Sequence, residues 1–535
     1  MPSALRQALA RAFIRVELVF DKAFGPRWNP FHQLGALAFF FYWIVAITGI
    51  YLFILFETSV AGAYDSVERL TIEQWYVGGV MRSLHRYASD AMVVTGLLHL
   101  VREFVLDRYR GMRWFAWFTG VPILWLLYAS GITGYWLVWD KLAQYVAVVT
   151  SEWLDWFPVF GEPIARNFLT TGSLGDRFFT LLIFLHIGVP LFLLFTMWIH
   201  LLRLSRPAVN PPRGLAAGAL VTLVVLSLLK PALSQGPADL SKVAADVGLD
   251  WFYLLLYPLL DVWPPGPVWA LVIGASLLLS ILPWLPPQRR PPVAVVDLEN
   301  CNGCGRCFAD CPFGAVTMVP RTDGRPYPTM AKVDPGICLS CGICVGSCPT
   351  ATPFRKAADL VTGIDLPELP LGRLREESQA AMEGLADAPK VLLYGCDHGI
   401  DVASLRDDGV AAVSLPCIAM LPPSFIDYAL SRGGMDGVLI TGCAEGECHY
   451  RFGTDWTDER LAGKRDPYLR ERVPRQRVRT CWAAPTERGK LTAALAAFRR
   501  DLAALPPAAF SEDAGPPAPP SSGRLAETAE DARRG

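Results

Sequence analysis

The first 290 positions of the chain are dominated by long apolar stretches separated by shorter polar ones. A run of about 20 apolar residues is what an α-helix needs to cross the hydrocarbon core of a bilayer. Six runs qualify, and they span residues 34–56, 78–104, 115–139, 178–202, 214–233 and 267–286. We therefore expect residues 1–290 to form an all-α bundle of six membrane helices.

Beyond this region the pattern becomes that of soluble domains. A proline-rich linker, PWLPPQRRPP, occupies residues 283–292, and residues 293–355 contain eight cysteines in two similar runs. Over residues 389–503, the apolar strands VLLYG and DGVLITG alternate with the helix-like SFIDYALSRGG, as in small α/β domains. Residues 506–535 are rich in Ala, Pro and Ser, which predicts a disordered tail.

Basic residues are distributed unevenly among the loops. They gather before the first apolar run, between the second and third, between the fourth and fifth, and after the sixth. Cytoplasmic loops carry such an excess of Lys and Arg, so the N-terminus and everything after the sixth run are predicted to be cytoplasmic. The first 30 residues form a basic amphipathic segment, and we expect no signal peptide. The pattern predicts a multi-pass protein of the inner membrane of a bacterium or archaeon.

Composition supports the division into an apolar half and a cysteine-rich half. Hydrophobic residues make up 52% of the chain and charged residues 19%, which is too apolar for an ordinary soluble enzyme. The formal net charge of −1 disfavours a nucleic-acid partner, which needs a strongly basic surface. All 13 cysteines lie at or after Cys301. This grouping favours metal sites in a reducing compartment over disulfides.

Four histidines lie inside the predicted membrane helices, His85 and His99 on the second and His186 and His200 on the fourth. Fourteen residues separate each pair, which is about 21 Å along a helix and ~40° short of four full turns. Each helix thus presents two imidazoles on nearly one face. The two helices run in the same direction, so His85 is predicted to face His186. By the same geometry His99 faces His200, and two levels of paired histidines suit two b haems.

The alternative is that these histidines make polar contacts between helices. Identical spacing on two parallel helices favours haem ligation instead. Glycines repeat the 14-residue spacing on the first segment, at Gly35 and Gly49, and on the third, at Gly120 and Gly134. A missing side chain lets a backbone approach a bulky planar group, so these segments are expected to form the other walls of the haem pockets.

Over roughly residues 28–285 the sequence resembles the cytochrome b of bc-type quinol-oxidising complexes. Besides the histidines and glycines, the resemblance rests on Arg82, Pro190, TGYWLVWD (133–140) and LDWFYL (249–254). It implies that Arg82 and the four glycines are cofactor-binding residues. A homodimer through this part of the chain is compatible with the resemblance.

The same resemblance implies two quinone pockets. The outer one would lie near Tyr135, Asp250 and Trp251, and the inner one near the inner haem and His32. LDWFYL departs from the family's Pro-Glu-Trp-Tyr motif, because Leu249 and Asp250 replace the proline and the glutamate. The alternative for His32 is an interfacial side chain near a haem propionate.

The two cysteine runs share the spacing CxxCxxCxxxCP. Three thiolates of a tight loop bind one cubane cluster, and the fourth ligand comes from the other run. One 4Fe–4S cluster is therefore assigned to Cys301, Cys304, Cys307 and Cys348. The second is assigned to Cys338, Cys341, Cys344 and Cys311. A zinc site would use two CxxC pairs and gives no reason for the CxxxCP ending. The runs resemble those of bacterial two-cluster ferredoxins.

Four further cysteines, Cys396, Cys417, Cys443 and Cys448, are spread over the predicted α/β domain. Their spacing alone is compatible with a 2Fe–2S cluster, zinc or buried free thiols. The segment DGVLITGCAEGECHYRFGT, followed by RVRTCWAAPTE, resembles the delta subunit of methyl-viologen-reducing hydrogenase. That resemblance implies that the four cysteines bind one 2Fe–2S cluster.

The remaining polar residues of this domain have simpler interpretations. Cys481 fits no ligand pattern and is predicted to be a packing residue. His398 and His449 are interpreted as surface residues in preference to ligands.

The predicted fold class is thus a membrane all-α six-helix di-haem cytochrome b bundle, followed by an α+β two-cluster ferredoxin domain and a small α/β iron–sulfur domain. No nucleotide-binding loop of the GxGxxG or GxxxxGKS kind and no nucleophile–base pair is found. We expect a subunit that carries electrons between the quinone pool and a cytoplasmic partner. The resemblance implies a heterodisulfide-reductase-type flavoprotein, or another dehydrogenase or hydrogenase.

Electron flow toward quinone is expected. The alternatives are an anchor and docking relay without quinone chemistry, and quinol oxidation in the bc manner.

Overall fold

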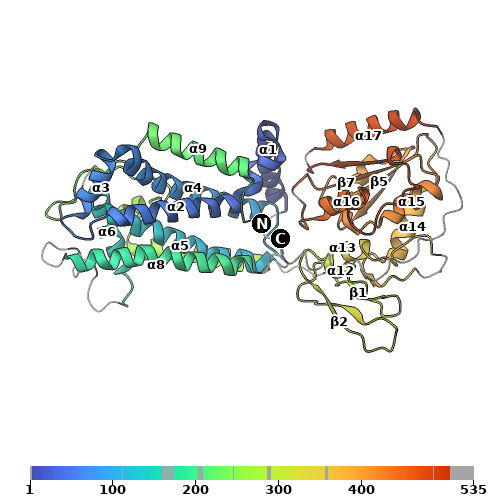
Figure 1. Ribbon diagram of the computed structural model, residues 1–535, viewed down its shortest axis with the longest axis horizontal. Coiled ribbons are helices and arrows are strands. Elements are labelled where there is room, and N and C mark those ends of the chain that lie inside the picture. The colour runs from blue at the N-terminus through green and yellow to red at the C-terminus, as the bar shows by residue number, and fades with distance from the viewer. Residues whose placement is uncertain are drawn as a thin grey trace. The chain divides into compact units, whose positions relative to one another are not determined.

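The computed structural model divides into two compact units, Met1–Gln288 and Arg289–Gly535 (Figure 1). It describes residues 3–110, 113–159, 164, 169, 174–202, 209–244, 246–285, 291–355, 360–446, 448–485 and 487–506. The division falls inside the proline-rich segment at 283–292. The predicted disordered tail, apart from Pro506, lies outside the described residues.

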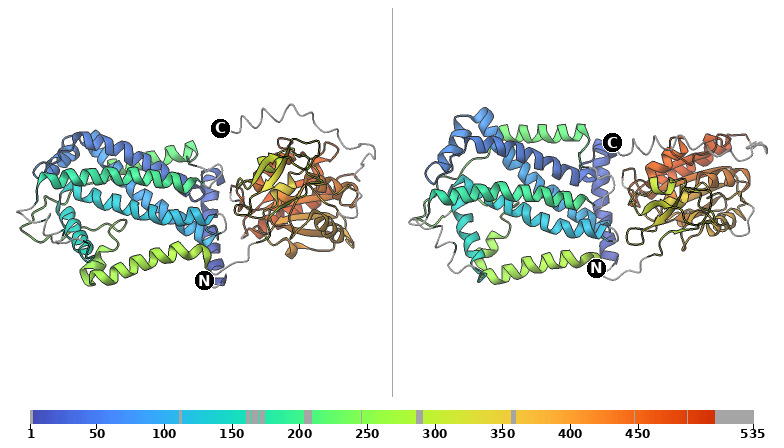
Figure 2. Two further views of the ribbon diagram at one scale, coloured as in Figure 1. Left: turned by 90° about the horizontal axis from the view of Figure 1, so that it is seen from below. Right: turned by 60° about the horizontal axis from the view of Figure 1, so that its bottom comes forward.

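The regular elements described in the first unit are helices. Its longer helices are α1 (Ser3–Phe24), α2 (Leu34–Leu55), α3 (Ala63–Ile72), α4 (Val80–Val105), α5 (Trp114–Val138), α6 (Lys141–Leu154), α8 (Asp176–Leu201), α9 (Arg213–Leu229), α10 (Tyr257–Val262) and α11 (Pro265–Ile281). Short turns are η1 (Pro26–Trp28), η2 (Pro30–Gln33), η3 (Trp75–Gly79) and η5 (Leu282–Trp284). Helix α2 packs along α4 and α5 along α8, and the four run side by side (Figures 1 and 2).

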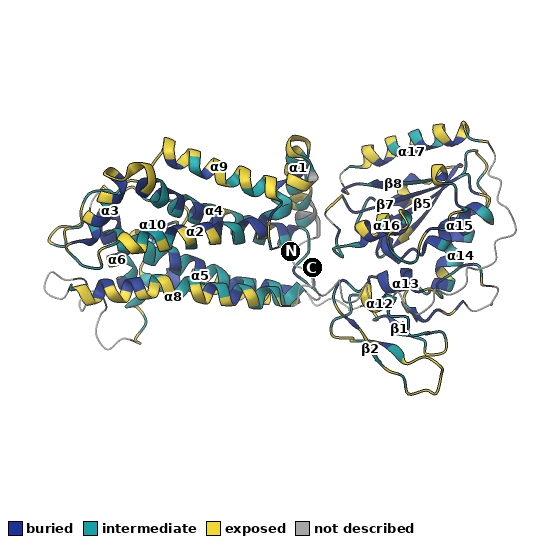
Figure 3. Cartoon of the chain, viewed as in Figure 1, coloured by how far each residue is buried: buried dark blue, intermediate teal, exposed yellow. Residues whose placement is uncertain are grey.

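Within the described residues, four helical segments are long and apolar enough to cross a membrane. They are Pro30–Leu55, Trp114–Val138, Asp176–Leu201 and Pro265–Trp284. Large apolar side chains on these helices point outward, including Ile54 at 73% and Phe184 at 74% exposure (Figure 3). Such apolar surface is what a lipid-facing helix presents.

The predicted count of six membrane helices is not confirmed. The second predicted span forms helix α4, which includes five charged residues, and the fifth forms α9, which has only 17 residues. Seventeen residues give about 26 Å, less than the ~30 Å of the hydrocarbon core. Several charges on α4 have partners on other elements. For example, Arg102 Nε donates to Glu17 of α1 at 2.7 Å, with both residues buried.

The second unit begins with a small part built from two antiparallel strand pairs. Strands β1 (Val295–Val296) and β4 (Ile364–Asp365) form one pair, and β2 (Val316–Pro320) and β3 (Thr329–Val333) form the other. Each cysteine run forms one short helix, α12 (Arg306–Ala309) or α13 (Ile343–Gly346). Gly305 and Gly342 precede these helices with φ near +75°, a conformation that favours glycine. The two runs thus repeat in structure as they do in sequence.

The rest of this unit is a four-stranded parallel sheet in the order β6-β5-β7-β8. The strands are β5 (Val391–Cys396), β6 (Val410–Leu415), β7 (Gly437–Gly442) and β8 (Val478–Trp482). The helices are α14 (Leu371–Met382), α15 (Pro423–Ser431), α16 (Gly453–Leu461) and α17 (Arg488–Ala503), with turns η6 (Val402–Leu405), η7 (Ile418–Met420) and η8 (Arg475–Arg477).

Helices cover both faces of the sheet, so its central strands are buried, as parallel strands usually are. Every residue of β5 and β7 is buried (Figure 3). Alternate residues of β5 serve opposite faces. Leu392 joins the core beneath α14 and α15, whereas Leu393 joins Phe498 of α17.

A buried carboxylate ties the loop after α16 to α15. Asp427 is 0% exposed and accepts from Arg470 Nη1 at 3.0 Å and from Arg472 Nη2 at 2.8 Å. Both guanidinium groups also lie over the ring of Phe354. Phe354 follows the second cysteine run, so this cluster links the small part of the unit to the sheet.

We expect Asp427→Asn to destabilise the second unit by about 3 kcal/mol, because the change leaves two cations beside a buried amide. In hydrogen exchange of the full-length protein, amides of β5 and β7 should then exchange on the order of 100-fold faster. The control is Glu376→Gln on the exposed face of α14, which should change exchange little. Equal exchange rates in the two variants would contradict the expectation.

Candidate redox centres

The four membrane-helix histidines meet in two pairs, one from α4 and one from α8 in each. The rings of His85 and His186 have centroids 6.2 Å apart and planes tilted by 61°. This separation leaves room for one metal ion about 2 Å from a nitrogen of each ring. His99 and His200 lie within electrostatic reach of each other at the second level. The described structure therefore brings together the histidines that the spacing pairs.

Each of the four glycines lies against one of these rings. A Cβ built on Gly49 would be 3.0 Å from Cε1 of His85, and one on Gly134 would be 2.8 Å from Cε1 of His186. At the second level, the corresponding distances are 3.5 Å from Gly35 to His99 and 3.6 Å from Gly120 to His200. The glycines let α2 approach α4, and α5 approach α8, closely enough to hold the ring edges.

Three of the histidines are oriented by hydrogen bonds that sequence reasoning missed. His85 Nδ1 lies 3.0 Å from the Val45 carbonyl oxygen and 3.1 Å from Thr48 Oγ1. His186 makes the same pair of contacts with Ser130, at 3.0 Å, and Thr133, at 3.2 Å. An Nδ1–H that donates to a carbonyl leaves Nε2 free to bind a metal. The donor set and its orientation thus fit a haem that one imidazole from each helix would hold.

A repeated Thr-Gly dipeptide in the sequence could have predicted these contacts. Thr48, Thr119 and Thr133 each precede one of the ring-contacting glycines. His200 Nδ1 lies 3.0 Å from Thr119 Oγ1, in line with this pattern. Gly35 is preceded by Leu34 instead, and His99 makes no hydrogen bond with the described residues. The second level is therefore asymmetric.

The predicted outer-pocket residues are only partly brought together. Arg86 lies between two of them, because its Nη2 donates to Asp250 Oδ2 at 2.5 Å and its guanidinium lies 4.6 Å from the centroid of the Tyr135 ring. Trp251 is 68% exposed. Sequence reasoning missed Asp90, which is 3.4 Å from Arg86 Nε. Among the described residues, Asp90 Oδ1 and Tyr135 OH are buried without a hydrogen-bond partner.

Arg82 is held by neighbours on several elements. Its guanidinium contacts Glu68 at 3.3 Å, Thr71, and Ser234 at 2.8 Å. Ser234 also donates to Glu68 at 2.6 Å. These partners fix the side chain one turn before His85.

His32 lies at the opposite level, three residues before Gly35. Its side chain is 5% exposed, and Nε2 is 3.7 Å from Asp21 Oδ1. The fully buried Asn29 donates to Asp21 at 2.8 Å and lies 3.5 Å from His32 Nε2. The helix α1 thereby supplies an acidic partner that sequence reasoning did not identify.

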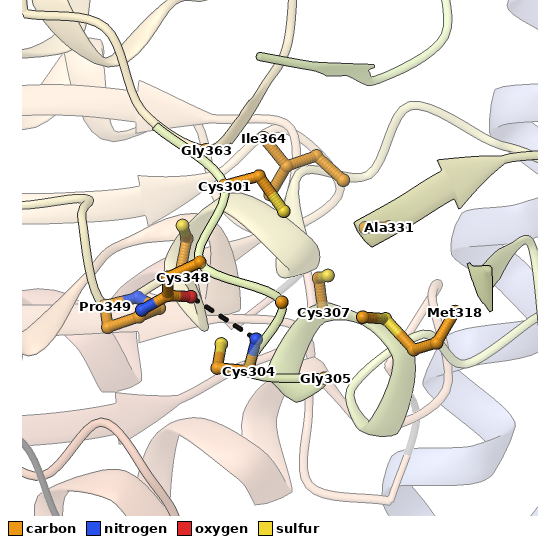
Figure 4. A pocket seen from close by; sticks show the side chains of 12 residues that line it. Cys301, Cys304, Gly305, Cys307, Met318, Ala331, Cys348, Pro349, Gly363 and Ile364 are labelled. Atoms are coloured by element: carbon orange, nitrogen blue, oxygen red, sulfur yellow. Dashed lines mark hydrogen bonds between the residues drawn. The ribbon is translucent and has the colours of Figure 1, made fainter. Parts of the chain in front are cut away.

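The two cysteine runs surround two separate cavities. The first is lined by Cys301, Cys304, Cys307 and Cys348, together with Met318, Ala331 and Ile364 (Figure 4). The second is lined by Cys311, Cys338, Cys341 and Cys344, together with Phe313 and Leu366. Each cavity thus receives three cysteines from one run and one from the other.

Burial raises the pKa of Cys307 to about 12 and also raises the pKa of Cys341 and Cys344. These side chains are therefore neutral thiols at pH 7 unless a metal displaces the proton. Binding of a cluster would supply that displacement, because metal ligands are thiolates. A cysteine-lined apolar cavity of this kind fits an iron–sulfur cluster.

The C-terminal cysteines gather at one edge of the parallel sheet. Cys396 ends β5, Cys443 follows β7, and Cys417 follows β6 by two residues. Their thiols and that of Cys448 lie within hydrogen-bonding distance of one another in successive pairs. The carboxyl ends of neighbouring parallel strands are a common location for ligand sites. The Gly453 amide donates to Cys448 Sγ at 3.2 Å.

The other polar residues of this domain lie as follows. Cys481 is on β8 and belongs to the core beneath α17. His398 and His449 stack with ring centroids 3.7 Å apart, beside Tyr450. Among the described residues, no group of three or more His, Cys, Asp or Glu side chains is arranged around a single metal ion. In a 4Fe–4S cluster each iron takes one protein thiolate and in a 2Fe–2S cluster each takes two, so the cysteines around a cluster do not converge on a single metal ion.

The second ferredoxin-type cavity adjoins the C-terminal cysteines. Cys341 and Cys417 belong to one buried cluster, together with Ile343, Ala419 and Trp456. A side chain at Gly342 would collide with Met420 of η7, since its Cβ would lie 2.5 Å from Sδ. The two sites are thus neighbours within one packed core.

Three family models match the chain in succession. Cytochrome b/b6/petB matches residues 19–207, the 4Fe-4S dicluster domain matches 300–352, and the delta subunit of methyl-viologen-reducing hydrogenase matches 388–506. Cytochrome b6 of Porphyra purpurea is 29% identical over 195 residues, which are 36% of this chain and 90% of that protein. A chain of a hyperthermophilic respiratory Complex III matches with a TM-score of 0.40 and 21% identity, over 48% of this chain and 75% of the other.

The three matches confirm the expected fusion and its order along the chain. A cytochrome b part implies b haems, and a 4Fe–4S dicluster part implies iron–sulfur clusters. Together they support a multi-pass membrane protein that serves as an electron-transfer subunit.

We expect Gly134→Val to displace His186, because the new side chain would occupy the space of the ring edge. Haem held by His186 should be lost, which a fall in the haem-to-protein ratio and a redox titration of the absorption bands would detect. The control is Gly188→Val on α8, the helix of His186, where a Cβ meets nothing within 4 Å. An unchanged haem-to-protein ratio with unchanged midpoints in the Gly134 variant would refute the contact.

Proposed function

We propose that this chain conducts electrons between a cytoplasmic redox partner and quinone in the membrane. In this proposal His85 and His186 hold one b haem, and His99 and His200 hold another. The eight cysteines of the two runs hold two 4Fe–4S clusters, with ligand sets as the two cavities group them. Cys396, Cys417, Cys443 and Cys448 hold one 2Fe–2S cluster.

The observation that carries the proposal is the adjacency of Cys341 and Cys417 in one buried cluster. An electron that arrives at the C-terminal cysteines would find the second ferredoxin-type site next to it, with apolar side chains that exclude water. The two levels of paired histidines would provide two further one-electron centres along the helical unit. When bound, haems and clusters supply one-electron oxidation and reduction, and the chain's own residues hold and separate them.

The docking end of this route is the C-terminal domain. Its match to a hydrogenase delta subunit favours a heterodisulfide-reductase-type flavoprotein, or another dehydrogenase or hydrogenase, as the partner. The distribution of basic loops favours a cytoplasmic location for this domain and the N-terminus. Lipid surrounds the helical unit, and a homodimer through that unit is part of the proposal.

Quinone is proposed to exchange electrons at the level of His99 and His200. His32 and Asp21 lie at this level and are buried together with Asn29. Quinone reduction consumes protons as well as electrons, and a histidine beside a carboxylate is suited to passing protons. Electrons are proposed to run from the clusters toward quinone.

A second candidate is quinol oxidation at the outer level, in the manner of bc complexes. Asp90 Oδ1 and Tyr135 OH, which have no hydrogen-bond partner in the described part of the chain, lie beside Arg86 and favour a polar ligand there. Asp250 retains a carboxylate but is paired with Arg86, so it would have to release Arg86 before accepting a proton. This pairing is why the outer level ranks second.

A combined titration tests the main proposal. Purified, detergent-extracted protein is titrated with a quinol analogue and with dithionite, while haem bands and cluster EPR signals are followed together. We expect quinol to reduce a b haem, and reduced clusters to refill that haem after oxidation. Clusters that respond to dithionite, with haems that never respond to quinol, would refute quinone exchange and favour the anchor and relay function.

The outer-level candidate predicts that Asp250→Asn lowers quinol-linked turnover at least tenfold, because the change removes the carboxylate that would accept the proton once Arg86 releases it. Turnover with the quinol analogue is the measurement. Asp261→Asn is the control, since Asp261 accepts a hydrogen bond only from Tyr145 among the described residues. Equal turnover in the two variants would remove the outer level from the mechanism.

A further inference from the structure

Arg460, at the end of α16, is one of the most deeply buried charges in the chain. It is 1% exposed, and its two terminal nitrogens bond to different parts of the second unit. Nη2 donates to Asp310 Oδ2 at 2.6 Å, and Nη1 donates to the Ala419 carbonyl at 2.7 Å. Asp310 precedes Cys311, and Ala419 follows Cys417 by two residues. The guanidinium group therefore bridges a backbone segment of each cysteine site.

The packing around this bridge is close. A Cβ at Gly346 would lie 2.0 Å from the Ala419 oxygen and 2.9 Å from Arg460 Nη1. The second oxygen of Asp310 accepts from Arg465 Nη1 at 2.6 Å, and Arg465 Nε donates to Glu459 at 2.5 Å. The bridge is thus fixed from both sides.

The charge of Arg460 is felt by its surroundings because water is excluded. Burial lowers its pKa, and Asp310 opposes that effect, so the group stays protonated at neutral pH. Its Nε is buried without a hydrogen-bond partner among the described residues. Cys417 lies within its electrostatic reach. A cation in a low-dielectric core stabilises the more negative state of a nearby redox centre and so raises its midpoint potential.

We propose that Arg460 is a positioning residue for electron transfer. It fixes the second ferredoxin-type site against the C-terminal cysteine site, and its charge holds the midpoint potentials of both above the values they would have without it. The inference rests on the cluster binding in the proposed function, and it adds the residue that fixes the two centres against each other and raises their midpoint potentials.

Charge variants of the full-length protein test this inference. Arg460→Met should lower the midpoint potential of the second ferredoxin-type cluster in an EPR-monitored redox titration, and Asp310→Asn should raise it. The double variant should return close to the wild-type midpoint, because the two charges are removed together. Arg460→Lys should keep most of the wild-type value. The matched control is Arg499→Met on α17, which loses an exposed ion pair with Asp407 and should shift nothing.

Opposite shifts in the two single variants distinguish an electrostatic role from damage to the fold, which would move both in one direction. Shifts of the same sign, or no shift in assembled protein, would overturn the inference. If Arg460→Met fails to assemble its clusters, the other two variants decide. A raised midpoint potential in Asp310→Asn and a nearly wild-type one in Arg460→Lys support the inference, and a lowered or unchanged midpoint in Asp310→Asn overturns it. A wild-type protein with cluster signals but no quinol-reducible haem would refute the proposed function and leave this test intact.

Discussion

The close approach of a glycine backbone to a histidine ring is the contact on which the helical unit depends. It occurs at both levels of the α2–α4 pair and of the α5–α8 pair. At Gly134 even a single added carbon would lie 2.8 Å from the ring of His186. Each helix pair therefore holds the edge of an imidazole ring against a glycine. This contact leaves the other ring nitrogens of His85 and His186 free to point at a common centre.

The threonine hydroxyls beside the histidine rings bond to carbonyls of their own helices, as a low-dielectric surrounding favours. The hydroxyl of Thr48 donates to the Ile44 carbonyl one turn earlier while it also contacts the ring of His85. Thr133 repeats this arrangement toward His186. His99 has no such hydrogen bond among the described residues, and its ring packs against Gly35. The level at which quinone exchange is proposed is thus the less constrained one.

In the second unit, the geometry of a parallel sheet brings the candidate ligand side chains together. Strands β5, β6 and β7 end at one edge, and they deliver cysteines to it from segments far apart in the chain. Arginines of the α16 end and the loop after it then join this edge to the ferredoxin-type part. Buried ion pairs are costly to form, so their value lies in fixing one arrangement over others.

The sequence by itself determined the features that depend on local periodicity. The 14-residue spacing of histidines and glycines and the CxxCxxCxxxCP runs are properties of single segments, so the paired levels and the two clusters of cysteines could be predicted. The helix count could not be predicted, because a hydropathy pattern does not show that the charges of α4 find partners such as Glu17.

Only the tertiary structure decided the pairing of Arg86 with Asp250, the adjacency of Cys341 and Cys417, and the Arg460 bridge. Each of these joins residues separated by tens to more than a hundred positions. No local pattern encodes such contacts, because they arise when separate elements pack and a buried charge must find its counter-charge.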